Sequence, residues 1–209
     1  DETKLRFEIY VDDFADWARI AGEQGSVGRV FLLGHSEGAL IATLAALTTD
    51  VSGVILIAGS GVPAGRLIAR QNDVSGAASS VRRKISEILG MLEFGDPYPN
   101  PPVSLHALFR SSIQPYLLSW FRYDPAAELG KLRLPVLIVQ GSTDFQVWRK
   151  DADLLSAASP HAIRADIDGM NHILKTAPSD RRQNYATYNM PDLPLATGLV
   201  DVLADFIRQ

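Results

Sequence analysis

The sequence predicts an α/β fold in which a mainly parallel sheet is flanked by helices. Strongly apolar runs occur at 30–33, 54–58 and 135–141, and a weaker alternating run follows at 161–167. Each run has the length of a buried strand, and glycines or turn-forming residues bound it. Segments with helical periodicity lie between the runs. Strands that alternate with helices form βαβ units, and these units build parallel sheets.

Length and composition suit one globular domain over residues 1–209. The formal net charge of −4 argues against nucleic acid or an anionic membrane as the main partner. The chain contains no cysteine, which excludes disulfides, thiolate metal sites and a cysteine nucleophile. No apolar run reaches transmembrane length, and the N-terminus carries no signal-peptide pattern. We therefore expect a cytoplasmic protein that binds neither nucleic acid nor membrane.

The first predicted element is an amphipathic helix that begins near Phe7 and ends between Gly22 and Gly25. Its apolar residues recur at helical spacing, which predicts a single stripe that faces the core. The stripe consists of Phe7, Tyr10, Phe14, Trp17, Ala18 and Ala21.

The segment 34–38 has the pattern Gly-x-Ser-x-Gly with Ser36 at its centre. A predicted strand leads into it, and the Ala/Leu-rich run 39–47, which predicts a buried helix, leads out. This context is typical of a nucleophile elbow, where a serine sits in strained backbone at a helix N-terminus. We expect Gly34 and Gly38 to be needed because side chains there would collide with neighbouring backbone. The alternative is an ordinary serine in a glycine-flanked turn.

Residues 62–130 differ from their surroundings because they contain helical patterns and no convincing strand. Helices are expected at 81–92 and 113–121, with an irregular, proline-rich loop at 95–102 between them. We interpret the segment as a helical cap that is inserted within the domain and covers Ser36 at one end of the sheet.

The last part of the chain is expected to contain a long loop and a closing helix. Residues 177–195 carry three prolines and no periodicity, which predicts a loop. The apolar residues between Leu199 and Phe206 have helical spacing and predict a terminal helix.

The segment 59–64, Gly-Ser-Gly-Val-Pro-Ala, matches the Gly-x-Gly-x-x-Gly/Ala pattern of dinucleotide-binding proteins. That pattern should be followed by a helix, a second strand and an acidic residue about twenty residues on. Here residues 71–80 are polar and small, and the next periodic segment is helical. A glycine-rich exit from the strand is the preferred interpretation, and a dinucleotide-binding enzyme is the alternative.

Three residues with complementary chemistry follow predicted strands. Ser36, Asp144 and His172 each come just after a strand, and catalytic groups in parallel sheets lie beyond the carboxyl ends of the strands. A serine hydroxyl becomes a nucleophile when a histidine accepts its proton, and an acid orients that histidine and stabilises its charged form. The sequence therefore predicts a Ser-His-Asp site at one edge of the sheet.

Other acids compete with Asp144 for the orienting role. Asp144 itself could be a turn aspartate, because such residues often follow strands. Asp166 and Asp168 precede His172 closely, but they share its strand and loop, which makes contact with the imidazole awkward.

Other histidines compete with His172 for the role of base. His35 neighbours Ser36 but is expected to point away from it on the elbow. His161 begins a strand and so lies at the wrong end of the sheet. The alternative for His172 is a loop residue without a catalytic role.

These segments resemble those of the α/β-hydrolase superfamily, in particular the bacterial esterase and serine-aminopeptidase-like hydrolase group. Gly-His-Ser-Glu-Gly at 34–38 is similar to that group's nucleophile segment. Residues 140–147 are similar to its acid segment and residues 169–172 to its histidine segment. Residues 114–125 resemble its cap, and the resemblance covers essentially all 209 residues.

The resemblance implies a serine hydrolase that cleaves carboxylic esters through an acyl-enzyme. Ser36 would be the nucleophile, His172 the general base and Asp144 the orienting acid. The backbone N–H of Glu37 would be one oxyanion donor. The resemblance implies a small-molecule ester as substrate, no cofactor and no metal.

Alternatives stay open within and beyond this reading. An aminopeptidase or a thioesterase would use the same three residues. A non-catalytic fragment or binding module would keep the fold without a complete oxyanion hole. Four cap residues could line an acyl pocket or pack within the cap's own core. They are Leu117, Leu118, Trp120 and Phe121.

The family's early strands and its first oxyanion loop have no counterpart before the helix at Phe7. The elbow strand is apolar on both faces, which suits the middle of a parallel sheet. Four strands that start at the elbow would leave one flank of the sheet unpaired. We therefore expect the C-terminal part of a longer hydrolase, whose open elbow-side edge pairs with an upstream segment or a second chain.

Overall fold

The computed structural model describes residues 1–73 and 76–209, and the chain divides into two compact units. The helical unit comprises Asp1–Asp13 and Val62–Asp124, and the sheet unit comprises Phe14–Gly61 and Pro125–Gln209. Residues 74–75 of the predicted cap lie outside the described residues. Within those described, no helix is long and apolar enough to cross a membrane.

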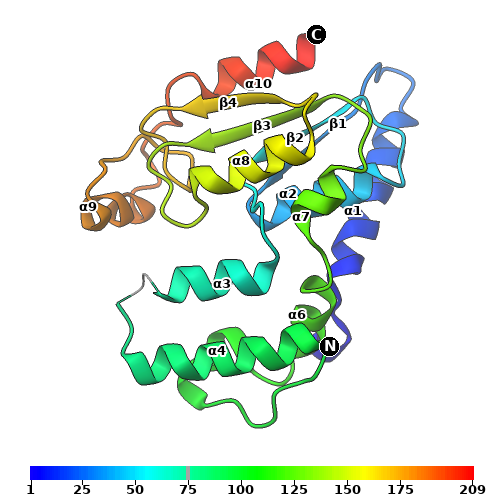
Figure 1. The fold of residues 1–209 in the computed structure, drawn as a ribbon. Helices are drawn as coiled ribbons and strands as arrows, with labels where there is room; N and C mark the ends of the chain where they lie inside the picture. The colour runs from blue at the N-terminus through cyan, green and yellow to red at the C-terminus, as the bar shows by residue number, and fades with distance from the viewer. Residues whose placement is uncertain (74–75) are drawn as a thin grey trace. The chain divides into compact units, whose positions relative to one another are not determined.

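The sheet unit is built on four parallel strands in the order β1-β2-β3-β4 (Figure 1). They are β1 (Phe31–His35), β2 (Gly53–Ile57), β3 (Val136–Gly141) and β4 (Ile163–Ile167). The four predicted strands and their parallel arrangement are thus confirmed. β2 and β3 are buried along their whole length, as expected for central strands of a parallel sheet covered on both faces.

Helices cover both faces of this sheet (Figure 1). The helices that pack on the sheet are α2 (Glu37–Ala46), α8 (Arg149–Ala158) and α10 (Leu199–Arg208), and α7 (Pro125–Leu129) packs against α2 and α8. α9 (Arg181–Ala186) and η3 (Thr187–Asn189) lie between β4 and α10 in the chain. α10 packs with Leu199 and Phe206 against the face that carries Ile55 and Leu137. α2 and α8 pack on the opposite face, because side chains alternate along a strand.

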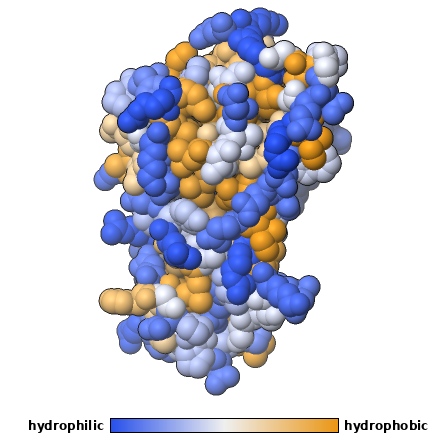
Figure 2. Space-filling model, turned by 90° about the vertical axis from the view of Figure 1, so that its right-hand side faces the viewer, coloured by the Kyte–Doolittle hydropathy of each residue, from blue (hydrophilic) through white to orange (hydrophobic). Residues whose placement is uncertain are grey.

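β1 is an edge strand. Among the described residues, its one strand neighbour is β2, so the expected unpaired flank beside the elbow strand is confirmed. The Leu33 side chain on this strand is 43% exposed. Figure 2 shows apolar side chains reaching the surface among polar ones on one face of the molecule. What pairs with the open edge of β1 stays a prediction.

The first long helix, α1 (Phe7–Gly22), has the predicted extent but a different buried face. Phe7, Val11 and Ala18 are buried, whereas Tyr10 is 43% and Trp17 68% exposed. The prediction that Tyr10 and Trp17 face the core was therefore wrong. The buried residues follow an i, i+4, i+11 spacing, which places the two aromatic residues at the margin of the packed face.

The helical unit contains helices and turns, and its described residues form no strand, as predicted. Besides the start of α1, its elements are η1 (Glu2–Lys4), α3 (Ala64–Asp73), α4 (Ser79–Phe94), η2 (Val103–Leu105), α5 (His106–Phe109) and α6 (Gln114–Trp120). The N-terminal segment is held against α6: the Phe7 ring stacks on Trp120 with centroids 5.9 Å apart. The Phe7 backbone N–H also donates to Ser119 Oγ at 2.7 Å. That this unit covers Ser36 stays a prediction.

Candidate active site

Ser36 lies on a sharp turn between the end of β1 and the start of α2. Its φ of 57° and ψ of −119° are strained for a residue with a side chain, as a nucleophile elbow requires. A Cβ at Gly34 would overlap the backbone carbonyl of Gly38, so Gly34 is required for the turn to close. The prediction for Gly38 was wrong, because a Cβ there would meet no atom within 4 Å.

The structure brings Ser36, His172 and Asp144 together in one hydrogen-bonded chain. His172 Nδ1 lies 2.8 Å from Asp144 Oδ2, and His172 Nε2 lies 3.1 Å from Ser36 Oγ. The Asp144 carboxylate can only accept, so Nδ1 carries the proton and Nε2 is the acceptor that faces the serine hydroxyl. His172 and Asp144 are both buried, which limits the competition of water for these bonds.

The carboxylate of Asp144 is fixed by backbone donors as well as by His172. Its Oδ1 accepts the backbone N–H groups of Gln146 at 2.8 Å and Val147 at 2.9 Å. A Cβ at Gly141 would overlap the backbone carbonyl of Met170, so this glycine lets the loop of His172 lie against the end of β3.

The competing acids are engaged elsewhere. Asp166 pairs with Arg149 and Arg164, at 2.8 and 3.0 Å. Asp168 accepts the hydroxyl of Ser142 at 3.0 Å. Of the three acids considered, Asp144 is the one that contacts the imidazole of His172.

A buried amide network braces the loop of His172. Asn171 Nδ2 donates to Thr187 Oγ1 at 2.8 Å, and Asn184 Nδ2 donates to the carbonyl of Thr143 at 3.1 Å. Asn171, Asn184 and Thr187 are all buried. Sequence reasoning missed this network because 177–195 was predicted to be a loop. The segment instead forms α9 and η3, and the signal for the helix start was Asp180, which caps the N–H of Gln183.

Two neighbours of Ser36 have perturbed ionisation. Burial raises the pKa of the Glu37 carboxyl to about 7. Burial, followed by the nearby charge of His172, lowers the pKa of His35 below its ordinary value. Glu37 begins α2, and the role of its backbone N–H as an oxyanion donor stays a prediction.

The glycine-rich segment 59–64 is packed against protein, which argues against a dinucleotide site. A Cβ at Gly61 would lie 2.5 Å from the carbonyl oxygen of Asp151, and the Gly61 N–H donates to the Asp151 carboxylate at 3.1 Å. Gly61 therefore allows close contact with α8, and its N–H, which could otherwise hold a phosphate, already has an acceptor. In residues 1–73 and 76–209, no group of three or more acids and histidines could hold a metal ion.

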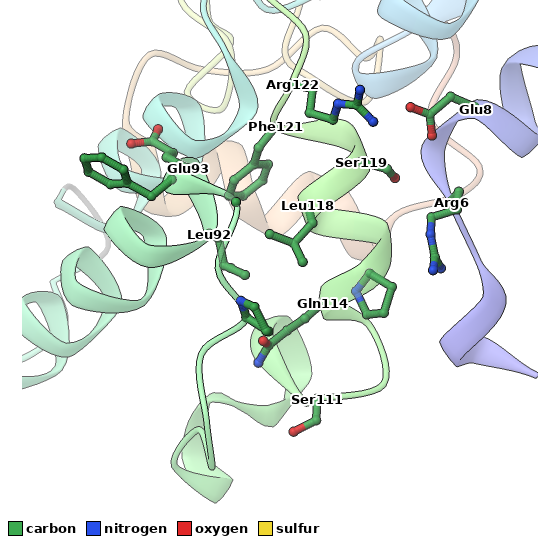
Figure 3. Close-up of a pocket in the computed structure, with 14 residues that line it drawn as sticks. Arg6, Glu8, Leu92, Glu93, Ser111, Gln114, Leu118, Ser119, Phe121 and Arg122 are labelled. Atoms are coloured by element: carbon green, nitrogen blue, oxygen red, sulfur yellow. The ribbon is translucent and has the colours of Figure 1, made fainter.

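The helical unit contains a pocket of about 780 Å³ (Figure 3). Leu118 and Phe121 of the predicted acyl-pocket residues line it, together with Leu92. Leu117 is buried and the half-buried Trp120 stacks on Phe7, so these two pack against other residues of the helical unit. Two of the four candidates thus line a pocket and two do not, and the role of that pocket in binding an acyl group stays a prediction.

Comparison with known proteins decides the family. A model described as "Alpha/beta hydrolase family" matches residues 6–186. The chain belongs to the alpha/beta hydrolase family. Among curated proteins, esterase EstD from Thermotoga maritima is 29% identical over 182 residues, which cover 83% of this chain. The match covers 42% of EstD, so this alpha/beta hydrolase spans less than half the length of that relative.

Solved structures share the alpha/beta hydrolase fold with this chain. Est1E from Butyrivibrio proteoclasticus, with ferulic acid bound, has a TM-score of 0.59 at 17% identity, and the match covers 99% of this chain and 71% of Est1E. A bromoperoxidase from Bacillus anthracis has a TM-score of 0.53 at 16% identity, and the match covers 98% of this chain and 75% of that one. At these identities the likeness shows the fold alone.

Proposed function

We propose that the chain hydrolyses carboxylic esters through an acyl-enzyme on Ser36. The observation that carries the proposal is the position of His172, whose two ring nitrogens are bonded to Ser36 and Asp144 at once. The family and the similarity to an esterase support the same reaction class.

The hydrogen bonds support a role for each residue in the proposed reaction. Ser36 Oγ attacks the ester carbonyl carbon while His172 Nε2 takes the hydroxyl proton. Asp144 holds the Nδ1–H and stabilises the imidazolium that forms. The imidazolium returns the proton to the leaving alcohol oxygen, which leaves the acyl group on Ser36. Water, activated by the same Nε2, then releases the acid.

Substrate selectivity is assigned to the helical unit, which we propose to act as a cap. The support is its pocket, whose apolar wall includes Leu92, Leu118 and Phe121 and whose volume suits a small molecule. An aminopeptidase or a thioesterase would use the same three residues, so the leaving group has to be identified by assay.

The test is hydrolysis of p-nitrophenyl esters of increasing acyl length, with matching anilide and thioester substrates. Ser36→Ala is expected to lose about 10³-fold or more in kcat, because it removes the nucleophile alone. Ser60→Ala is the matched control, since Ser60 also follows a strand but contacts Asp151. If Ser36→Ala keeps more than half of the wild-type rate, Ser36 is not the nucleophile. If a fluorophosphonate probe fails to label the wild type, the binding-module alternative replaces this proposal.

A further inference from the structure

We propose that His35 is a positioning residue, which ties the backbone of His172 to the strand that carries Ser36. This inference rests on the proposed function for its effect on rate, but its geometric content can be tested separately. Sequence reasoning expected His35 to point away from Ser36, and it assigned no role to it.

The contact is a direct hydrogen bond between the two histidines. His35 Nε2 lies 2.8 Å from the backbone carbonyl oxygen of His172. Since a carbonyl can only accept, Nε2 of His35 carries a proton. The two rings are also tilted against each other, with centroids 4.8 Å apart and planes at 44°. His35 therefore contacts both the backbone and the ring of His172.

The charge state of His35 suits this place. Burial and the nearby charge of His172 keep the pKa of His35 below its ordinary value, so the ring is a neutral donor. A permanent cation this close would oppose the imidazolium that His172 becomes when it takes the serine proton. A neutral N–H donor holds the loop without that cost, and neither lysine nor arginine could replace it.

His35 completes the restraints on His172. The ring nitrogens of His172 are bonded to Asp144 and Ser36, and Asn171 anchors the preceding residue to Thr187. Of these restraints, the bond from His35 joins the backbone of His172 to β1, one residue before Ser36. Loss of this bond would let the imidazole move relative to the serine while the other anchors stay.

The experiment compares three substitutions of His35. His35→Gln places an amide N–H near the position of Nε2, His35→Phe keeps the ring without a donor, and His35→Asn keeps an amide that is too short to reach. We expect kcat to fall about 10- to 100-fold in the Phe and Asn variants with KM nearly unchanged, because displacing a reacting group by about 1 Å costs about that much. His35→Gln should recover most of the loss. Circular dichroism and the melting temperature check the fold of each variant.

A second readout does not depend on turnover. The Nδ1–H proton of His172, held by Asp144, should give a downfield proton resonance in the wild type, in Ser36→Ala and in His35→Gln. It should broaden or disappear in His35→Phe and His35→Asn, because the ring is no longer held. If the Phe and Asn variants keep wild-type kcat and resonance, or if His35→Gln is as impaired as they are, the inference is wrong. If the wild type and the variants show these resonances as expected but the wild type does not hydrolyse esters, the proposed function is refuted and the positioning role stands.

Discussion

Replacing Asp144 by asparagine would trap His172 in the wrong tautomer, and the structure explains why. Oδ1 of Asp144 accepts two backbone N–H groups, from Gln146 and Val147. An amide NH₂ at that position would face two donors, so the amide oxygen must stay there. The NH₂ group then faces Nδ1 of His172, which has to accept, and the ring proton moves to Nε2. An Nε2–H that faces Ser36 cannot take the serine proton.

The size of the effect follows from the cost of turning the amide around. The reversed amide restores the productive tautomer but leaves one buried and one partly buried N–H group without this acceptor, at about 1–3 kcal/mol each and so about 2–6 kcal/mol together. At about 1.4 kcal/mol per factor of ten, the productive arrangement becomes about 30-fold to about 10⁴-fold rarer. The variant also lacks the carboxylate that stabilises the imidazolium. We therefore expect kcat to fall by about 10³- to 10⁴-fold.

The assay measures kcat and KM for p-nitrophenyl acetate in the wild type, Asp144→Asn and Asp168→Asn. Asp168 is an exposed acid close to the site, and it accepts a hydrogen bond from Ser142 and not from His172. The Asp168→Asn variant should therefore keep the wild-type kcat. KM should change little in Asp144→Asn, because the substitution alters no substrate contact of the proposed mechanism. A folded Asp144→Asn variant that keeps more than about one tenth of the wild-type kcat would refute the tautomer argument.

Three further predictions test the elbow, its acidic neighbour and the pocket. Gly34→Ala should lower the unfolding free energy by about 1–3 kcal/mol or more and abolish ester hydrolysis, because its Cβ would overlap the backbone of Gly38. Gly38→Ala should be tolerated, and urea unfolding of both variants measures the difference. Burial raises the pKa of Glu37 from 4.5 to about 7, so the folded state keeps a proton that the unfolded state releases. The melting temperature of the wild type should therefore fall as the pH rises from about 4.5 to about 7, and the melting temperature of Glu37→Gln should not show that fall. Leu118→Trp should shorten the longest acyl chain that is hydrolysed, and Leu108→Trp, on an exposed residue outside the pocket, should not.

The strands and the common position of Ser36, Asp144 and His172 could be predicted from the sequence for one physical reason. A central parallel strand has to be apolar on both faces, so it appears as an uninterrupted run such as 54–58. All parallel strands end at the same edge of the sheet, so polar residues directly after such runs lie close together in space. That rule places Ser36, Asp144 and His172 at one edge without any knowledge of their contacts.

The supporting residues could not be predicted because their partners lie on elements without a sequence signal. Asn171 reaches Thr187 on a short 3₁₀ turn, and Asn184 lies on a helix of six residues, too short to show periodicity. The prediction of the buried face of α1 was wrong for a related reason. Helical spacing locates an apolar stripe on a helix, but it does not show which part of that stripe another element covers, and Trp17 is left exposed.

Gly34 and Gly141 have the same role near Ser36 and near His172, because each allows two backbone segments to lie in close contact. The first lets the start of α2 lie against β1, and the second lets the loop of His172 lie against the end of β3. Backbone bonds then fix both ends: the Ser36 N–H donates to the carbonyl of Ile57 at 2.9 Å, and the Thr143 N–H donates to the carbonyl of Met170 at 3.1 Å. The backbone contacts that position Ser36 and His172 therefore form a frame that does not involve the side chains of Ser36, His172 and Asp144. It follows that Ser36→Ala and Asp144→Asn change the chemistry within an intact frame, whereas Gly34→Ala changes the frame itself. The two classes of variant should separate in an unfolding experiment even where both abolish turnover.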